Sequence, residues 1–204
     1  MPMWTKRLAA IGLMAALASG EAAAQTGPAI IQNFSAPGNL ETTYLLGCIE
    51  LKAAKSVYNP VDLFRASRAC IAVQRYDDAV RLFGLARAFG RYDMKRVADS
   101  TAHQAVSMAQ LTIFDGLPDS EMQKFNATFK ELLSDDVKKT DYCVEVARIG
   151  PPSYMPRYMI QHGMSAFFSG MNAGGGVKNG LVENFDSKSA WDETLTLYLK
   201  CKSS

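Results

Sequence analysis

The sequence predicts an all-α protein, either a right-handed array of helical hairpins or an irregular, repeat-like helical bundle, braced by disulfides. Three observations support this prediction. Apolar residues recur at three- and four-residue spacing through most of the chain. No segment shows the sustained alternation of apolar and polar residues that a half-buried strand needs. The chain has 204 residues, 48% of them hydrophobic and 21% charged, with an even set of 4 cysteines, a composition typical of a globular domain.

Residues 1–24 have the features of a secretory signal peptide. Lys6 and Arg7 precede a short apolar stretch over residues 8–18, and the alanines at 22–24 place small residues before a cut at Gln25. We therefore expect an exported protein, periplasmic or secreted. Beyond Gln25 no apolar run approaches the roughly 18 to 20 residues of a membrane-spanning helix, so the sequence predicts no span in the mature chain.

The cysteines predict two disulfides, because four cysteines in an oxidising compartment favour pairing, although three pairings are possible. Cys48 and Cys70 lie symmetrically about Asn59, where Asn59-Pro60 marks the end of one helix and the start of the next. In an antiparallel hairpin the two sulfurs would lie opposite each other, at the same distance from the turn. We therefore predict a disulfide between Cys48 and Cys70, which leaves Cys143 to pair with Cys201. No Cys-x-x-Cys pair occurs and only 2 histidines are present, so no metal and no cofactor are expected.

The N-terminal half is expected to form an irregular segment followed by four helices. Prolines and glycines disrupt every period in residues 25–38, which predicts a flexible segment ahead of one helical domain over 39–204. Capping residues, Gly, Pro and apolar stripes predict helices at 39–56, 60–73, 76–89 and 92–114. We expect the third to end before Gly90 and the fourth to run unbroken, because it holds neither Gly nor Pro.

The C-terminal half is expected to hold four more helices. A start at Asp119 or Ser120, a stop at Gly150-Pro151-Pro152 and capping at Asp186 or Ser187 set most of their ends. The predicted helices cover 119–133, a segment around 142–146, 156–168 and 187–200. Between the last two, residues 172–180 are rich in Gly and Asn and predict a flexible loop or lid.

Residues 63–86 resemble one tetratricopeptide repeat. The positions where that repeat places its large and small packing residues are occupied by Leu63, Ala66, Ser67, Cys70, Tyr76, Ala79, Phe83 and Ala86. The sequence departs from the pattern at Cys70, where the repeat usually has an aromatic residue, and has Arg91 in place of the closing proline. No second repeat follows at a shift of about 34 residues. The resemblance implies a repeat-like helical hairpin and a protein-binding surface rather than a long solenoid.

One cluster of side chains could bind a ligand. Its members are Tyr154, Arg157, Tyr158, Gln161 and His162. At helical spacing they combine aromatic faces with donors for an anionic or polar group, and the glycine-rich loop follows them. The alternative is an amphipathic helix whose aromatic residues pack inward. The other histidine, His103, lies among small residues and is expected to pack or hydrogen-bond in the core.

Several function classes find no support in the sequence. A net charge of +2 gives no basic field for nucleic acid, and residues 172–180 lack the spacing of a nucleotide-binding loop. Asp135, Asp136 and Asp141 lack the ligand spacing of a calcium loop. No nucleophile and base are arranged as in a hydrolase, so we expect a binding protein rather than an enzyme.

The expected function is that of an exported helical module that binds another protein, as an adaptor, an assembly factor or an immunity-type protein that neutralises a toxin. Two alternatives remain open at this stage. One is a small-ligand binder or hydrolase that uses the cluster at Tyr154, Arg157, Tyr158 and His162, with the glycine-rich loop closing over it. The other is a purely structural component of the cell envelope. No feature of the sequence specifies the partner or an oligomeric state.

Overall fold

The computed structural model describes residues 36–173 and 179–202. The predicted signal peptide over 1–24, nearly all of the segment 25–38 and most of the glycine-rich loop lie outside the described residues.

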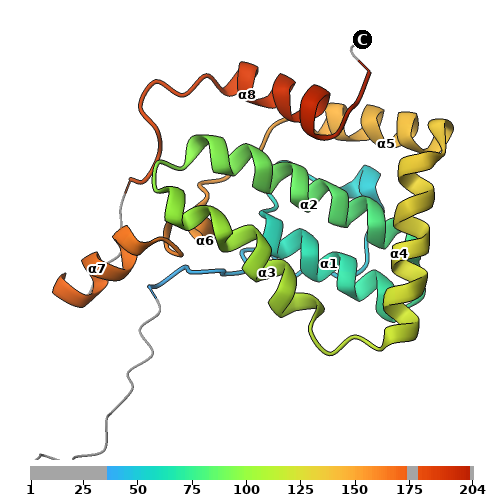
Figure 1. Ribbon diagram of the computed structural model, residues 1–204, viewed down its shortest axis with the longest axis horizontal. Helices are drawn as coiled ribbons and strands as arrows, with labels where there is room; N and C mark the ends of the chain where they lie inside the picture. The colour runs from blue at the N-terminus through green and yellow to red at the C-terminus, as the bar shows by residue number, and fades with distance from the viewer. Residues whose placement is uncertain (1–35, 174–178, 203–204) are drawn as a thin grey trace, which may run out of the picture. The chain divides into compact units, whose positions relative to one another are not determined.

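Within the described ranges the protein is all-α, with eight α-helices, two 3-10 turns, one π-helical turn and no strand, as the sequence predicts (Figure 1). The α-helices are α1 (Pro60–Ala72), α2 (Tyr76–Arg96), α3 (Ala105–Phe114), α4 (Asp119–Ser134), α5 (Asp136–Ile149), α6 (Arg157–Ile160), α7 (Met164–Ala173) and α8 (Ser187–Glu193). The 3-10 turns are η1 (Leu51–Ala53) and η2 (Ser100–Gln104), and the π-helical turn η3 (Thr194–Tyr198) continues α8. Both predicted disulfides, Cys48–Cys70 and Cys143–Cys201, are confirmed.

The hairpin of α1 and α2 forms the centre of the fold. Asn59 caps α1 through the backbone amides of Val61 and Asp62, and Pro60 occupies its first turn, where a missing N–H costs nothing. The two helices are further joined where the Ser67 hydroxyl donates to the Ala79 carbonyl oxygen at 2.7 Å. In Figure 1, α1 and α3 lie beside α2 on one side, and α5 and α8 lie on the other.

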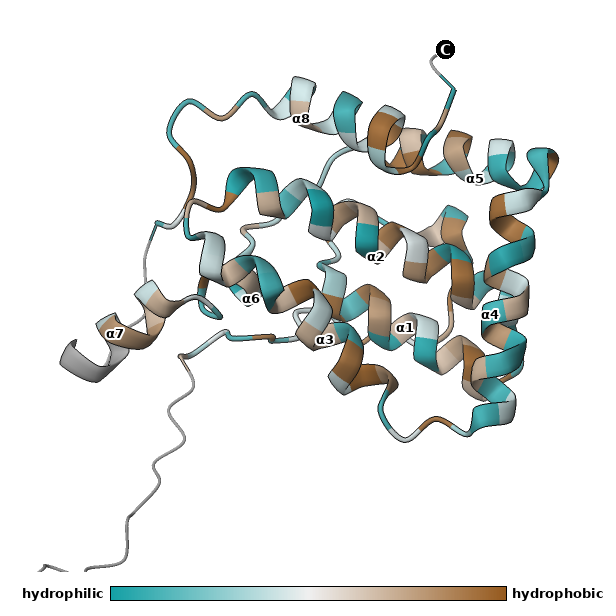
Figure 2. Ribbon diagram, in the orientation of Figure 1, coloured by the Kyte–Doolittle hydropathy of each residue, from teal (hydrophilic) through white to brown (hydrophobic). Residues whose placement is uncertain are grey.

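An aromatic cluster centred on Phe83 joins four helices at one end of this hairpin. The Phe83 ring lies 5.3 to 5.5 Å, between centroids, from the rings of Phe64, Phe114, Phe125 and Phe129. These rings come from α1, α3 and α4, and three of the four contacts are edge-to-face, the favoured geometry for aromatic pairs. Figure 2 shows hydrophobic and hydrophilic residues mixed along α2 and α4, as expected of helices with one buried side.

The predicted helix at 39–56 is wrong. This segment is an extended strap with turns and only the short η1. The Asp62 carboxylate accepts hydrogen bonds from the backbone N–H of Thr43 and of Tyr44, at 2.7 and 3.0 Å, so these donors serve the tertiary fold and not a local helix. Leu40 has φ of 51°, which also interrupts helical backbone. Cys48 nevertheless reaches Cys70, because the chain still reverses at Asn59.

The predicted end of the helix before Gly90 is also wrong, since α2 continues to Arg96. Gly90 serves the packing of two helices and not a helix end. A Cβ built on Gly90 would lie 2.7 Å from Cγ2 of Val106, closer than two carbon atoms approach. The glycine therefore lets α2 and α3 come together, a role that a helix-stop rule does not foresee.

The helix predicted over 92–114 is broken at residues 97–99. Val97 forms an isolated antiparallel bridge with Leu181, in which the Ala98 N–H donates to the Gly180 carbonyl oxygen at 2.8 Å and the Val182 N–H donates to the Arg96 carbonyl oxygen at 2.9 Å. These bonds take the place of the helical ones. A segment without Gly or Pro is thus interrupted by a contact with residues more than eighty positions away.

Candidate functional site

The predicted aromatic cluster is built around a buried carboxylate. Tyr154 and Tyr158 each donate a hydroxyl hydrogen bond to Oδ2 of Asp93 at 2.8 Å. Arg96 donates from Nε to Oδ1 of the same residue at 2.7 Å. Asp93 is completely buried, and Arg96 is 8% exposed. Two of the five predicted binding residues are therefore joined to α2 through one carboxylate.

Burial governs the electrostatics of this cluster. It raises the pKa of the Asp93 carboxyl, while the Arg96 charge and the two hydroxyl donors oppose that shift. Burial and the nearby Asp93 raise the pKa values of Tyr154 and Tyr158 well above the ordinary value, so both hydroxyls stay protonated and donate. The guanidinium of Arg96 also lies 5.2 and 5.1 Å from the ring centroids of Tyr92 and Tyr154, a cation–π arrangement.

The other three predicted residues lie apart from this carboxylate. Arg157 is exposed at the start of α6, and Gln161 is buried. His162 is half-buried, and its Nδ1 lies 2.9 Å from Oδ1 of Asn39 in the strap. Burial lowers the pKa of His162, which favours the neutral ring. None of the five residues lines the two hollows described below, and ligand binding at this cluster stays a prediction.

The helix expected to run from 156 to 168 is two helices with a break at Gly163. Asp99 and Thr101 cap the second one: the Ser165 N–H donates to Oδ2 of Asp99 at 3.0 Å, and the Met164 N–H donates to Oγ1 of Thr101 at 2.9 Å. Asp99 and Ala102 lie against Gly163 and leave no room for a Cβ there. The break is thus fixed by Asp99, the N-cap residue of η2, and by side chains of that turn.

His103 has the hydrogen-bonding role that the sequence favours. Its Nε2 lies 3.0 Å from the carbonyl oxygen of Val97, next to the bridge that interrupts the helix. The ring thereby supports the backbone at that break.

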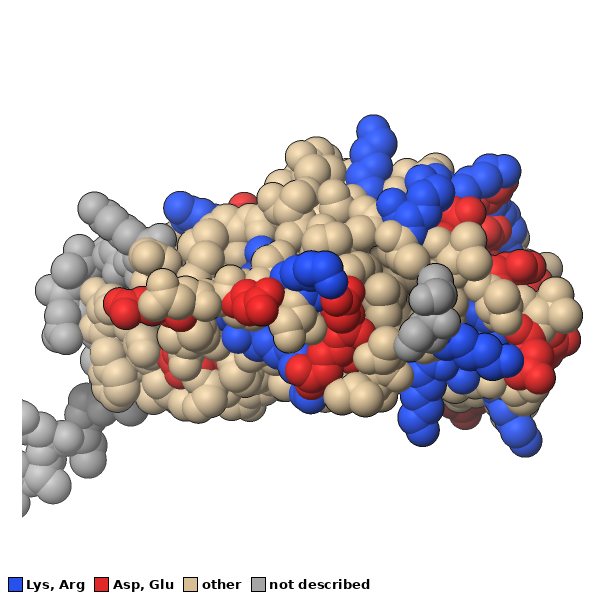
Figure 3. Space-filling view, turned by 90° about the horizontal axis from the view of Figure 1, so that it is seen from above, with Lys and Arg blue, Asp and Glu red and all other residues tan. Residues whose placement is uncertain are grey.

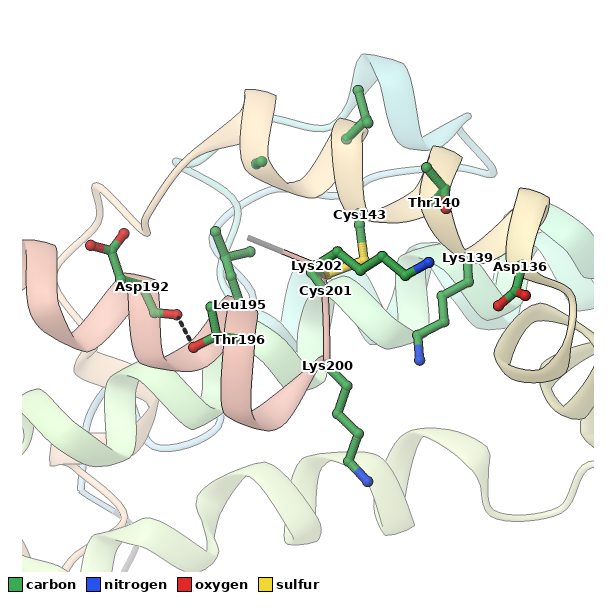
Figure 4. Close-up of a pocket in the computed structure, with 12 residues that line it drawn as sticks. Asp136, Lys139, Thr140, Cys143, Asp192, Leu195, Thr196, Lys200, Cys201 and Lys202 are labelled. Carbon is green, nitrogen blue, oxygen red and sulfur yellow. Dashed lines mark hydrogen bonds between the residues drawn. A yellow bond between two sulfur atoms is a disulfide. The ribbon is translucent and has the colours of Figure 1, made fainter. Parts of the chain in front are cut away.

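A groove of about 650 Å³ lies between α5 and the end of α8 with η3 (Figure 4). The disulfide Cys143–Cys201 joins its two walls, with the two Cα atoms 5.7 Å apart. The Cys201 N–H donates to the Leu195 carbonyl oxygen at 2.9 Å, which fixes the turn that leaves η3. The groove is lined by Asp136, Lys139, Thr140, Cys143, Val144, Ala147, Asp192, Leu195, Thr196, Lys200, Cys201 and Lys202.

The charged side chains of this groove are unbalanced. Among the residues that the structure describes, Lys139, Lys200 and Lys202 have no carboxylate within 4.0 Å. Of the two aspartates, Asp192 is 2.7 Å from Lys188, which neutralises it. Lys and Arg side chains gather in the right half of the face in Figure 3, with acidic groups between them. The groove thus has an excess of positive charge.

Local sequence patterns do not indicate this groove, but the predicted disulfide between Cys143 and Cys201 does. Lys139 lies one helical turn before Cys143, and Lys200 and Lys202 flank Cys201. Pairing these two cysteines therefore brings together three lysines that are more than sixty residues apart in sequence, Lys139 on one side and Lys200 and Lys202 on the other. A charge count along the chain does not show such a cluster, because the overall net charge is only +2.

Fold and groove define a disulfide-braced, all-helical protein with a basic groove beside one disulfide. No protein-family model, curated protein or solved structure matches the chain. Among the described residues, no three Cys, His, Asp or Glu side chains are grouped so that they could hold a metal ion. No helix in the described part of the chain is long and apolar enough to cross a membrane.

Proposed function

We propose that this protein is a helical module that binds another protein, and that the groove between α5 and α8 receives an acidic segment of that partner. The observation that carries the proposal is the excess of positive charge in the groove. Lys139, Lys200 and Lys202 have no carboxylate partner among the described residues, so carboxylates of a partner would supply one.

Apolar groups in the same groove would add affinity to this charge complementarity. Val144 is 60% exposed, and Ala147 and Leu195 also line the groove. A partner segment that covered them would remove apolar surface from water. The expected ligand is therefore a peptide segment with acidic and apolar side chains, and its binding should weaken as salt screens the lysines.

The disulfide supports this role because it fixes the two walls before binding. A preformed groove spares the free energy of ordering its walls when the partner arrives. An adaptor, an assembly factor or an immunity-type protein would each use a rigid surface of this kind.

The same proposal places the protein outside the reducing cytosol. All 4 cysteines are engaged in the two disulfides, and such bonds persist in oxidising compartments. The proposed periplasmic or secreted location agrees with the leader pattern at residues 1–24. Alkylation of the protein in intact cells, before and after reduction, would test it: thiols that react without reduction would contradict an oxidising location.

The binding proposal is tested with a pull-down from an envelope extract. The bait is the full mature chain, compared with the double variant Lys200→Glu/Lys202→Glu, and captured proteins are quantified by mass spectrometry at two salt concentrations. We expect at least one protein to be captured by the wild type, to be released by added salt, and to be lost from the double variant.

A matched control has the same change of charge at another place. Lys55 and Lys130 are exposed and lie outside the groove, so Lys55→Glu/Lys130→Glu should keep the partner. If both double variants lose it equally, or if no captured protein depends on Lys200 and Lys202, the groove is not the binding site.

A further inference from the structure

A second, smaller hollow of about 350 Å³ lies among α2, α4, α5 and the end of η3, and it shares only Lys139 with the groove described above. Its walls are mainly apolar. It is lined by Gly84, Arg87, Phe129, Leu132, Leu133, Lys139, Tyr142, Tyr198 and Leu199. Its volume falls within the range of about 300 to 1,000 Å³ that is typical of small-molecule sites.

A buried hydroxyl without a partner belongs to this hollow. Tyr142 is 5% exposed, and its hydroxyl has no hydrogen-bond partner among the described residues. A Cβ built on Gly84 would lie 2.6 Å from this oxygen, so the glycine leaves the room that the hydroxyl occupies. Burying a hydroxyl without a hydrogen bond costs free energy, which a ligand with a suitable oxygen would recover.

Two cations lie at the same hollow without a neutralising carboxylate. Arg87 donates from Nε to the Tyr198 hydroxyl at 3.0 Å and from Nη1 to Oε1 of Gln110 at 3.2 Å. Both acceptors are uncharged, so the guanidinium is held in place while its charge stays unbalanced. Neither Arg87 nor Lys139 has a carboxylate within 4.0 Å in the part of the chain that the structure describes.

We propose that this hollow binds a small amphiphilic carboxylate. The apolar body would lie against Phe129, Leu132 and Leu133, the carboxylate would face Arg87 and Lys139, and a ligand oxygen would accept the hydrogen bond that the Tyr142 hydroxyl lacks. This site goes beyond the protein-binding proposal, and it does not depend on Lys200 or Lys202.

The protonation state of Tyr142 suits this role. Burial raises the pKa of its phenol above the ordinary value, so the hydroxyl keeps its proton and can donate across the physiological range.

The probe is octanoate, with octan-1-ol and octylammonium as ligands of similar length and different charge, titrated calorimetrically into the full mature chain at low salt. We expect one saturable site for octanoate, affinity at least about tenfold lower for octan-1-ol because it lacks the charge-assisted bonds, and no binding of octylammonium. Equal affinity for octanoate and octan-1-ol, or no saturable binding of octanoate, would overturn the proposal.

Tyr142→Phe distinguishes a ligand role of the hydroxyl from a packing role. A ligand role predicts weaker octanoate binding without a loss of stability, and a packing role predicts a loss of stability without weaker binding. We expect octanoate affinity to fall about fivefold to tenfold, as for the loss of one hydrogen bond. The midpoint of thermal unfolding without ligand should stay the same or rise, since a buried hydroxyl without a partner is removed. Unchanged octanoate affinity would contradict the role of Tyr142.

A variant that fills the hollow locates the binding. Leu133 lines the hollow and is 52% exposed, so Leu133→Trp is expected to fold and to abolish octanoate binding. Leu111 is 63% exposed on α3 and lies outside the hollow, which makes Leu111→Trp the matched control. Octanoate binding that survives in Leu133→Trp as in the control would place it elsewhere and refute this site.

Discussion

Gly90 of α2 packs directly against Val106 of α3, with no space for a side chain between them. A Cβ built on Gly90 would lie 2.7 Å from Cγ2 and 2.8 Å from Cγ1 of Val106. Both atoms belong to a β-branched side chain on a helix, which has little rotational freedom to move away. This contact therefore limits how closely α2 and the start of α3 can approach each other.

Gly90→Ala should destabilise the protein, although alanine is the better helix former. We expect the overpacking to exceed the gain in helix propensity and to lower the free energy of unfolding by about 1 to 3 kcal/mol. Urea unfolding followed by circular dichroism measures the change. The second substitution Val106→Ala should restore part of the loss, and Gly47→Ala, where nothing lies within 4 Å of the new Cβ, should change stability little. An equal loss with and without Val106→Ala would show that this contact is not the cause.

The Asp93 network should be essential for stability, because its charges are buried. Asp93→Asn leaves the Arg96 guanidinium without its counter-charge, and we expect a loss of about 3 to 5 kcal/mol, as for a broken buried ion pair. Tyr154→Phe removes one of the donors to the carboxylate and should cost less, about 1 to 3 kcal/mol. Thermal and urea unfolding of both variants give the comparison. A smaller loss for Asp93→Asn than for Tyr154→Phe would be inconsistent with the ion pair as the main contribution.

The parts of the fold that could be predicted from the sequence are those that depend on local contacts. Helices α1, α4 and α5 have local signals at their ends, such as Asn59-Pro60 before α1 and Gly150 after α5, and their apolar stripes face the core. The strap at 39–56 and the break at Val97 depend on hydrogen bonds with distant partners, Asp62 in the first case and residues 180–182 in the second. A local sequence pattern does not show which distant residue will accept or donate these hydrogen bonds.

The candidate site shows the same limit of local patterns. Residues close together in the sequence predict the cluster at Tyr154 and Tyr158, but their shared partner in the structure is Asp93, more than sixty positions away. The basic groove needs the pairing of Cys143 with Cys201 before its lysines become neighbours. The pairing itself was predictable for another reason, because Cys48 and Cys70 flank one reversal of the chain and leave the other two cysteines to each other.

The cap of α7 should make that helix sensitive to acid. Burial would raise the pKa of Asp99, but hydrogen bonds from Thr101 and Ser165 outweigh it and lower the pKa to about 2. A carboxyl whose pKa is lower in the folded state stabilises fully above its unfolded value of about 3.9, and this contribution is lost as the pH falls toward 2. We expect the Ser165 amide to lose protection from hydrogen exchange over this range.

Asp99→Ala removes that contribution, together with the cap that the same carboxylate provides for η2. It removes the cap at every pH, so we expect a loss of about 0.5 to 2 kcal/mol at neutral pH and a weaker dependence of stability on pH between 4 and 2 than in the wild type. The matched control is Asp119→Ala at the start of α4, where Asp119 makes no cap. If the acid dependence of Asp99→Ala equals that of the wild type, another carboxyl is responsible.

The disulfide beside the basic groove should serve both stability and binding. Cys143 and Cys201 are 58 residues apart, and a closed loop of that length corresponds to about 4 kcal/mol in the chain-entropy view of crosslinks. We expect Cys143→Ser/Cys201→Ser to lower the unfolding free energy by up to this amount, measured by urea titration.

At a temperature where the variant is still folded, capture of the partner should also fall, because α8 and η3 are no longer fixed to α5. Cys48→Ser/Cys70→Ser removes the other disulfide, far from the groove in sequence, and should keep the partner while folded. Loss of capture in both double variants, or in neither, would show that the partner does not recognise the groove between α5 and α8.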